Sequence, residues 1–142
     1  MPVGHILEVT LPNSFDGFRF EVRERAEMPL NAEGAADRDG QFIYLREDVY
    51  DALCDNDGRA RFTASHELGH FALHTRQPLN RAPSLETLPA FEDSEKQADQ
   101  FAACLLMPRQ LMNPRDDVAD IVTRFGVSQR AAEIRLRKTR KA

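Results

Sequence analysis

The first third of the chain alternates apolar and polar side chains with the period of a β-strand. Residues 17–23, "GFRFEVR", place phenylalanine or valine at every second position between charged residues. This alternation is typical of a half-buried strand. A second β-rich run, "GQFIYLRE", covers residues 40–47. The segment "EDVYDALC" at 47–54 favours a short helix that ends before the turn signal "DNDG".

The middle of the chain favours two longer helices separated by an irregular loop. Asp57 is a suitable N-cap for a helix that runs through "RFTASHELGHFALH" towards Pro78. Residues 76–93 hold three prolines and are predicted to form a loop. Ser94, with Gln97 three positions later, fits a capping box at the start of the next helix.

That next helix should bury one face, because its apolar residues recur at i, i+3, i+4, i+7 and i+8 before Pro108 ends it. They are Ala98, Phe101, Ala102, Leu105 and Leu106. Two shorter helices follow within residues 114–138, separated by a turn at "GVS". The first of the two has its apolar residues on one face, and they are Val118, Ile121, Val122 and Phe125.

These elements predict a small α+β fold with strands first and helices after them. A chain of 142 residues suits one domain. We expect a single domain over residues 1–142, with a β-rich part at 1–56, a helical core at 57–108 and C-terminal helices at 114–138.

Composition favours a protein of the cytoplasm. Hydrophobic residues make up 42% and charged residues 30% of the chain, and the N-terminus does not resemble a signal peptide. The longest apolar run, "FAACLLM", is too short to cross a bilayer, so no membrane contact is expected. Cys54 and Cys104 form no CxxC pair and are expected to be buried free thiols in a reducing compartment.

The net charge of −4 is unevenly distributed. Residues 129–142 carry six Lys or Arg and one acid, or +5, which leaves 13 basic and 22 acidic residues, or −9, in the other 128. A short basic end can attract nucleic acid or an acidic partner. It is also an ordinary solvated helix end, where cations suit the helix dipole. The acidic remainder argues against direct nucleic-acid binding.

The stretch "HELGH" carries the candidate chemistry. His66 and His70 are four residues apart on a predicted helix, so both imidazoles point the same way and can reach one metal ion. Glu67, one position round the helix, would lie beside the ion and accept a proton from water whose pKa the ion lowers. By composition alone the HExxH pattern arises by chance in about one such chain in a hundred. A third ligand is therefore required.

Glu95 is the best candidate for the third ligand. It opens a helix whose other face is apolar, and Asp99 follows four residues later on the same side. The "EKQAD" segment thus offers one carboxylate to the metal and a second that can orient a ligand histidine. As an alternative, Glu95 is an ordinary first-turn acid that the helix dipole favours.

Other candidates fit less well. His74 lies eight residues beyond His66, about 12 Å along the axis, so a regular helix cannot bring both to one ion. It is expected at a helix end or along the cleft. Glu86, Glu92 and Asp93 lie in the predicted loop and stay open as ligands.

The two motifs together closely resemble those of the ImmA/IrrE family of metallo-endopeptidases. "RFTASHELGHFALH" is followed by "EKQADQFAACLLMP", and the likeness extends over roughly residues 15–138. The resemblance implies a zincin-like fold of the gluzincin type. It also implies a zinc ion, Zn²⁺, as cofactor, bound by His66, His70 and Glu95, with Glu67 as catalytic base. Asp99 takes a position that often holds Asn in the family and would orient a ligand histidine.

The family's known activity is the site-specific cleavage of helix-turn-helix repressors of the XRE type, which derepresses transcription. This resemblance therefore implies a protein substrate. One alternative is a non-proteolytic metal-binding regulator or toxin that acts by binding its repressor. Another is DNA binding through the two C-terminal helices and their basic end. The sequence leaves the oligomeric state open.

Overall fold

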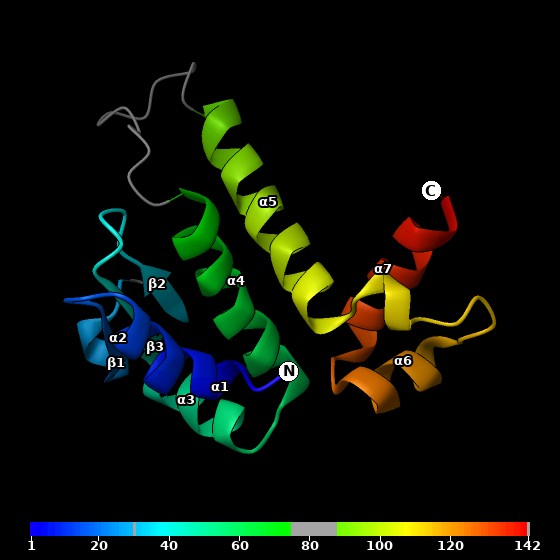
Figure 1. The fold of residues 1–142 in the computed structure, drawn as a ribbon, viewed down its shortest axis with the longest axis horizontal. Helices are drawn as coiled ribbons and strands as arrows, with labels where there is room; N and C mark the ends of the chain where they lie inside the picture. Colours follow the sequence, from blue (N-terminus) through cyan, green and yellow to red (C-terminus); the bar gives the residue numbers. More distant parts are fainter. Residues whose placement is uncertain (30, 75–87, 142) are drawn as a thin grey trace.

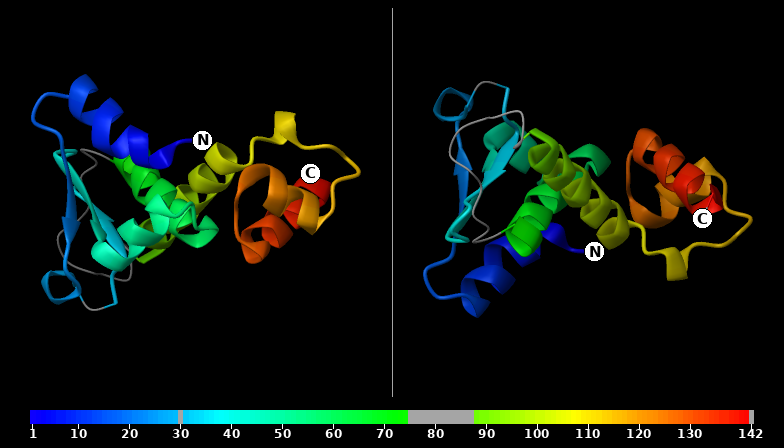
Figure 2. Two further views of the ribbon diagram at one scale, coloured as in Figure 1. Left: turned by 90° about the horizontal axis from the view of Figure 1, so that it is seen from below. Right: turned by 90° about the horizontal axis from the view of Figure 1, so that it is seen from above.

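The computed structural model describes residues 1–29, 31–74 and 88–141. The described elements are helices and one three-stranded sheet, so the predicted α+β class is confirmed. The sheet lies at one end of the molecule beside the N-terminal helices, and the last two helices lie at the other end (Figures 1 and 2). The two long helices connect these ends.

The chain begins with a helical segment that was not predicted from the sequence. Val3, Leu7 and Leu11 recur at intervals of four and are buried, so one side of the segment faces the core. Helices therefore precede the strands, contrary to the expected order. The segment consists of α1 (Val3–His5), the π-helical turn η1 (Ile6–Thr10) and α2 (Leu11–Ser14).

The sheet contains both predicted strands and a third, very short one. The strand order is β1-β3-β2, with β1 parallel to β3 and β2 antiparallel to it. The third strand, "GAA", was missed because three small residues show no alternation. The strands are β1 (Arg19–Arg23), β2 (Gly34–Ala36) and β3 (Phe42–Arg46).

The predicted short helix and the predicted long helix both follow the sheet. The short helix is α3 (Glu47–Cys54), and a 3-10 turn, η2 (Arg25–Glu27), lies earlier, after β1. Asp57 is the N-cap of α4 (Gly58–His74), because its side chain accepts a hydrogen bond from the Ala60 backbone N–H at 2.9 Å. The proposed approach of this helix to Pro78 lies outside the described residues.

The helix after the predicted loop starts earlier than expected. Helix α5 spans Leu88–Leu106, so Ser94 lies inside it and the predicted capping box is wrong. The loop prediction is likewise wrong for residues 88–93, and residues 76–87 lie outside the described part. Pro89 is tolerated in the first turn of α5 because backbone N–H groups there have no partner within the helix. The predicted end of the helix before Pro108 is confirmed.

Helices α4 and α5 run antiparallel, side by side (Figure 1). Gly69 allows their close approach, because a Cβ at that position would lie 3.1 Å from the Ala98 Cα atom. Ala98, Ala102 and Leu106 are buried on the face of α5 predicted to be core.

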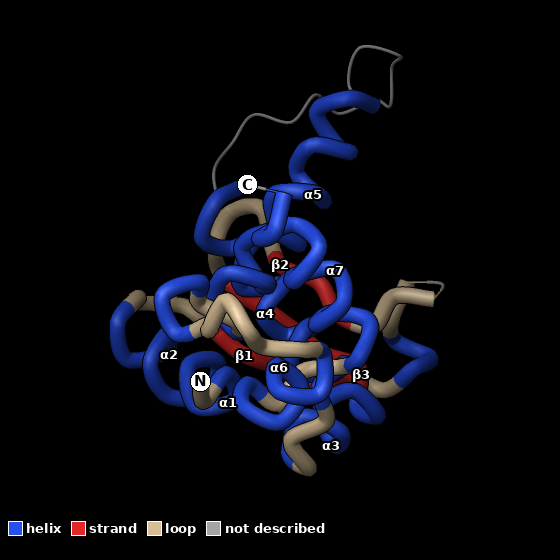
Figure 3. Tube along the Cα trace, turned by 90° about the vertical axis from the view of Figure 1, so that its right-hand side faces the viewer, coloured by secondary structure: helices blue, strands red, loops and turns tan. Residues whose placement is uncertain are grey.

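The C-terminal part forms the two predicted helices, α6 (Val118–Phe125) and α7 (Gln129–Lys141), after a 3-10 turn, η3 (Arg109–Leu111). Asp117 caps α6 in a capping box, and Gly126 ends the helix with a φ of 62°. The apolar face predicted for α6 packs against the core, with Ile121 fully buried. Seen from the side of α6 and α7, the strands lie behind these helices (Figure 3).

Both cysteines are free thiols, but their predicted burial is wrong because both are exposed. Cys104 lies off the apolar face of α5, beside Gln100 and Arg135, and Cys54 is the last residue of α3. Separately, none of the helices in the described part of the chain combines the length and apolarity that a membrane span requires.

Candidate metal centre

Helix α4 brings the two histidines of the HELGH motif together. His66 and His70 are one turn apart, both half-buried, and their Nε2 atoms lie 3.0 Å from each other. Their rings are nearly perpendicular, with centroids 4.7 Å apart. The i, i+4 spacing thus aims two imidazole nitrogens at one point, as the sequence predicts.

Glu95 on α5 supplies a carboxylate at the same point. Its Oε2 lies 3.1 Å from His66 Nε2, and its Oε1 lies 3.0 Å from His70 Nε2. His66, His70 and Glu95 each offer a ligand atom, and these atoms all lie within 4.8 Å of one another. Glu92 and Asp93 do not join this group, and Glu86 lies outside the described residues.

The spacing of these atoms fits a bound metal ion. Donors held at about 2.0–2.1 Å by a tetrahedral zinc ion lie about 3.3 Å apart. The observed separations of 3.0 to 3.1 Å are close to that value. Two imidazoles and one carboxylate also form a ligand set that catalytic zinc sites use, with a fourth position left for water.

Asp99 contacts the first histidine on the side away from Glu95. Its Oδ1 lies 2.8 Å from His66 Nδ1, one turn along α5 from Glu95. An ionised carboxylate only accepts hydrogen bonds, so His66 Nδ1 carries the proton and its Nε2 keeps a lone pair for a metal. The arrangement is the one predicted from the "EKQAD" spacing.

Burial favours the neutral form of the second histidine. It lowers the pKa of His70, and the neighbouring His66 and His74 lower it further, while Glu95 opposes the shift. Only a neutral imidazole has a lone pair for a metal ion. His70 is therefore suited to coordination at neutral pH.

His74 lies at the end of α4 and lines the cavity, as expected from the sequence, but its contacts with His70 and Gln97 were not predicted. The structure buries this last residue of α4 against His70, with 3.0 Å between their Nδ1 atoms. Its Nε2 lies 2.9 Å from the Oε1 atom of Gln97 on α5. The four-residue spacing of His70 and His74 in the sequence could have indicated their contact.

Glu67 is buried next to the three candidate ligands. Burial raises its pKa to about 7, with Glu95 adding to the rise and His66 opposing it. Among the described residues, no hydrogen bond to its carboxylate is found. The carboxylate lines a cavity of about 340 Å³, so it can accept a proton from a molecule held there.

Strand β2 and the two residues after it line one wall of this cavity. They are Gly34, Ala35, Ala36, Asp37 and Arg38, none of which the sequence singled out. Gly34 allows the strand to approach Glu67, because a Cβ at Gly34 would lie 3.0 Å from the Glu67 Cγ atom. The same Cβ would lie 2.9 Å from the Leu45 Cδ2 atom, so the position is too crowded for a side chain.

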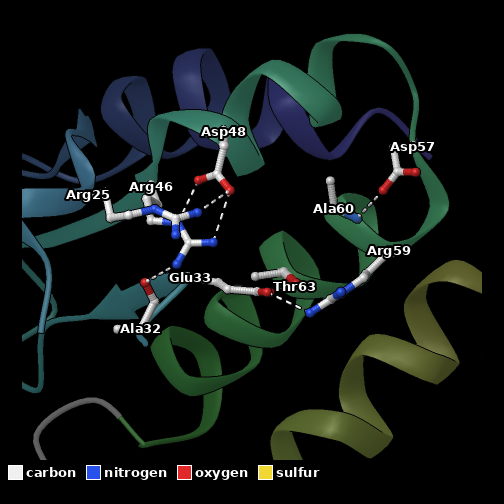
Figure 4. A network of polar contacts seen from close by, with 9 residues as sticks. All are labelled: Arg25, Ala32, Glu33, Arg46, Asp48, Asp57, Arg59, Ala60 and Thr63. Carbon is white, nitrogen blue, oxygen red and sulfur yellow. Dashed lines mark hydrogen bonds and ion pairs between the residues drawn. The ribbon is translucent and has the colours of Figure 1, made fainter. Parts of the chain in front are cut away.

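A network of polar contacts holds the start of β2 against the helices (Figure 4). The Glu33 carboxylate accepts hydrogen bonds from Arg59 at 2.6 Å and Thr63 at 3.2 Å, both on α4. Arg46 donates to the Ala32 carbonyl oxygen and pairs with Asp48, which lowers the pKa of Asp48 to about 2. The wall of the cavity is thereby fixed to the helix that carries HELGH.

Comparison with known proteins agrees with the resemblance seen in the sequence. The family model described as the IrrE N-terminal-like domain, Peptidase_M78, matches residues 24–137. No curated protein and no solved structure matches the chain significantly. The matched span is most of the chain and includes His66, Glu67, His70 and Glu95. The chain therefore belongs to the Peptidase_M78 family of IrrE N-terminal-like domains and is a metallopeptidase of the IrrE/ImmA type.

Proposed function

We propose that the chain is a zinc-dependent endopeptidase that hydrolyses one specific bond in a protein substrate. The main support is the convergence of His66, His70 and Glu95 beside buried Glu67, on one cavity wall. This set supplies three ligands and a base, as a catalytic zinc site requires.

The chain's own residues divide the chemistry between them. Bound zinc supplies Lewis acidity and lowers the pKa of water to about 7. Glu67 accepts a proton from the water that attacks the peptide carbonyl carbon. It then returns this proton to the amide nitrogen as the C–N bond breaks. Asp99 holds His66 in the tautomer that leaves Nε2 unprotonated.

The edge strand beside the site suits an extended peptide. In the described sheet, β2 pairs with β3 on one side only. Its three residues line the same cavity as Glu67 and the three candidate ligands, and these strand residues have small side chains or none. A substrate segment that adds to β2 as a further strand would lie across the metal centre.

The substrate we propose is an XRE-type helix-turn-helix repressor, cleaved in the cytoplasm so that transcription is derepressed. Similarity to the ImmA/IrrE family supports this choice, and two free thiols are consistent with a reducing compartment. The partner is therefore a protein. Neither direct nucleic-acid binding nor membrane binding is part of the proposal.

Metal content tests the centre. Wild type, His66→Ala and Glu95→Ala would be purified without added metal and analysed for elements beside Glu92→Ala, an exposed acid on the same helix. We expect about one zinc per chain in wild type and in Glu92→Ala, and loss in the other two variants. Wild type that takes up no zinc even when it is supplied would contradict the proposal.

Cleavage is tested in a lysate of the organism that encodes the chain. The lysate is treated with wild type or Glu67→Gln, and new protein N-termini are mapped. Glu67→Gln should retain zinc but lose activity by a factor of at least about 100. New termini confined to one repressor with wild type would support the proposal. Equal zinc in both proteins with no new terminus in either would favour the non-proteolytic regulator.

A further inference from the structure

His74 has both ring nitrogens engaged, although it is too far from His66 to share a metal ion with it. It lies one turn beyond His70 and is buried. Its Nδ1 faces His70 Nδ1 at 3.0 Å, and its Nε2 faces the side-chain oxygen of Gln97 at 2.9 Å. A chain of contacts thus runs from Gln97 through His74 to His70.

The Gln97 side-chain oxygen determines which ring nitrogen of His74 and of His70 carries a proton. An amide oxygen only accepts, so His74 carries its proton on Nε2. A neutral imidazole has one N–H group, which leaves His74 Nδ1 as an acceptor. His70 Nδ1 must therefore donate, and the remaining lone pair of His70 lies on Nε2, which faces Glu95 and His66.

The opposite orientation of the Gln97 amide is incompatible with a metal at this point. Its NH₂ group would then donate to His74 Nε2, and His74 Nδ1 would donate to His70 Nδ1. His70 would keep its proton on Nε2, where no metal could bind. The amide oxygen must face His74 for His70 to act as a ligand.

We propose that His74 and Gln97 are positioning residues that fix His70 in its metal-binding tautomer. The inference rests on the proposed function, because it takes His70 as a metal ligand. At His66 the corresponding partner is the Asp99 carboxylate, which lies 2.8 Å from Nδ1. At His70 the two outer partners, His74 and Gln97, carry no carboxylate, so no further negative charge is added beside Glu67 and Glu95.

The proton positions can be measured directly by ¹⁵N NMR of histidine side chains in the metal-free protein above neutral pH. We expect His70 as the Nδ1–H tautomer and His74 as the Nε2–H tautomer in wild type. In Gln97→Met, which lacks the acceptor, both histidines should populate both tautomers. Gln97→Glu keeps an acceptor and should preserve the wild-type pattern.

Zinc affinity, measured by competition with a chelator, gives the second readout. His74→Ala should bind zinc about 10–100-fold more weakly than wild type, the usual effect of losing such an outer partner. Zinc affinity should fall several-fold in Gln97→Met and should stay within about threefold of wild type in Gln97→Glu. His5→Ala, which removes the exposed histidine of α1, is the matched control and should change nothing.

Two results would overturn the inference. One is a wild-type protein in which His70 is the Nε2–H tautomer and His74 the Nδ1–H tautomer. The other is an unchanged zinc affinity in both His74→Ala and Gln97→Met, while His66→Ala abolishes binding. The latter would leave the proposed function intact. A wild type that binds no zinc would instead contradict the proposed function. The tautomers of the metal-free protein would still test whether Gln97 and His74 set the proton position on His70. Gln97 is exposed, so its variants remain informative if His74→Ala fails to fold.

Discussion

At the scale of single residues, Glu67 combines deep burial with a position beside the candidate ligands. Its pKa in the folded, metal-free chain is about 7, against an ordinary value of 4.5. Between these values the folded chain holds a proton that the unfolded chain has lost. The free energy of unfolding therefore falls as pH rises from about 4.5 to about 7, and it levels off above that.

We expect Glu67→Gln to remove this decline. The free energy of unfolding of the metal-free variant, minus that of wild type, should therefore rise by up to about 3 kcal/mol between pH 4.5 and pH 7.5. Urea unfolding of chelator-treated proteins across this range measures it. The difference between the two proteins is the useful quantity, because the lowered pKa of His70 acts with the opposite sign in both. Parallel stability curves would mean that the carboxyl of Glu67 is not perturbed.

At the scale of elements, the contact between α4 and α5 sets the geometry of the centre. His66 and His70 come from one helix and Glu95 from the other, so the distance between the helices decides whether three donors meet. Gly69 lies at the contact between the two helices. A Cβ there would lie 3.1 Å from the Phe101 ring and 3.2 Å from the Ala98 carbonyl oxygen.

Gly69→Val should therefore push the helices apart. We expect a loss of about 1–3 kcal/mol in stability from overpacking and a zinc affinity at least tenfold weaker. Chelator competition and thermal unfolding measure the two effects. Ala72→Val, at an exposed position of the same helix, adds the same β-branch without the contact and should leave zinc affinity unchanged. Normal zinc affinity in Gly69→Val would show that the helix separation is not limiting.

Some elements followed from local sequence and others did not. Asp57 and α4 were predicted because a cap and a helical period are properties of neighbouring residues. The start of α5 was placed six residues too late. Ser94 and Gln97 fitted a capping box, but the helix already begins at Leu88, and Gln97 instead faces His74. Side-chain spacing alone cannot distinguish a cap from a residue in the helix interior.

At the scale of the whole molecule, Arg61 links parts of the chain that are far apart in sequence. Its guanidinium donates to the backbone oxygens of Phe125 and Gly126 at 2.6 Å and to that of Met1 at 3.1 Å. One side chain on α4 thus joins the N-terminus to the turn between the last two helices. Burial lowers its pKa.

Arg61→Met should cost about 1–3 kcal/mol in the free energy of unfolding, because it leaves carbonyl oxygens without a donor. Zinc affinity should not change, since Arg61 does not touch the centre. Arg59→Met is the matched control two residues earlier. Its exposed ion pair with Glu33 should contribute less than about 1 kcal/mol. Equal losses in the two variants, measured by urea unfolding, would contradict the linking role of Arg61.

The sequence by itself determined the chemistry that one helix can display. The His66–His70 pair and its adjacent Glu67 depend only on helical geometry, and the Glu95–Asp99 pair likewise. The motifs were specific enough to indicate the family that the comparison found. The α+β class followed from the change of apolar period along the chain.

Only the tertiary structure decided which groups meet between elements. His74 and Gln97 are 23 residues apart, and their contact depends on the packing of α4 against α5. The approach of Gly34 to Glu67 depends on a strand too short to show a pattern. Local periodicity records which face of an element is buried. It does not record what lies against that face, because this is set by close packing between distant segments.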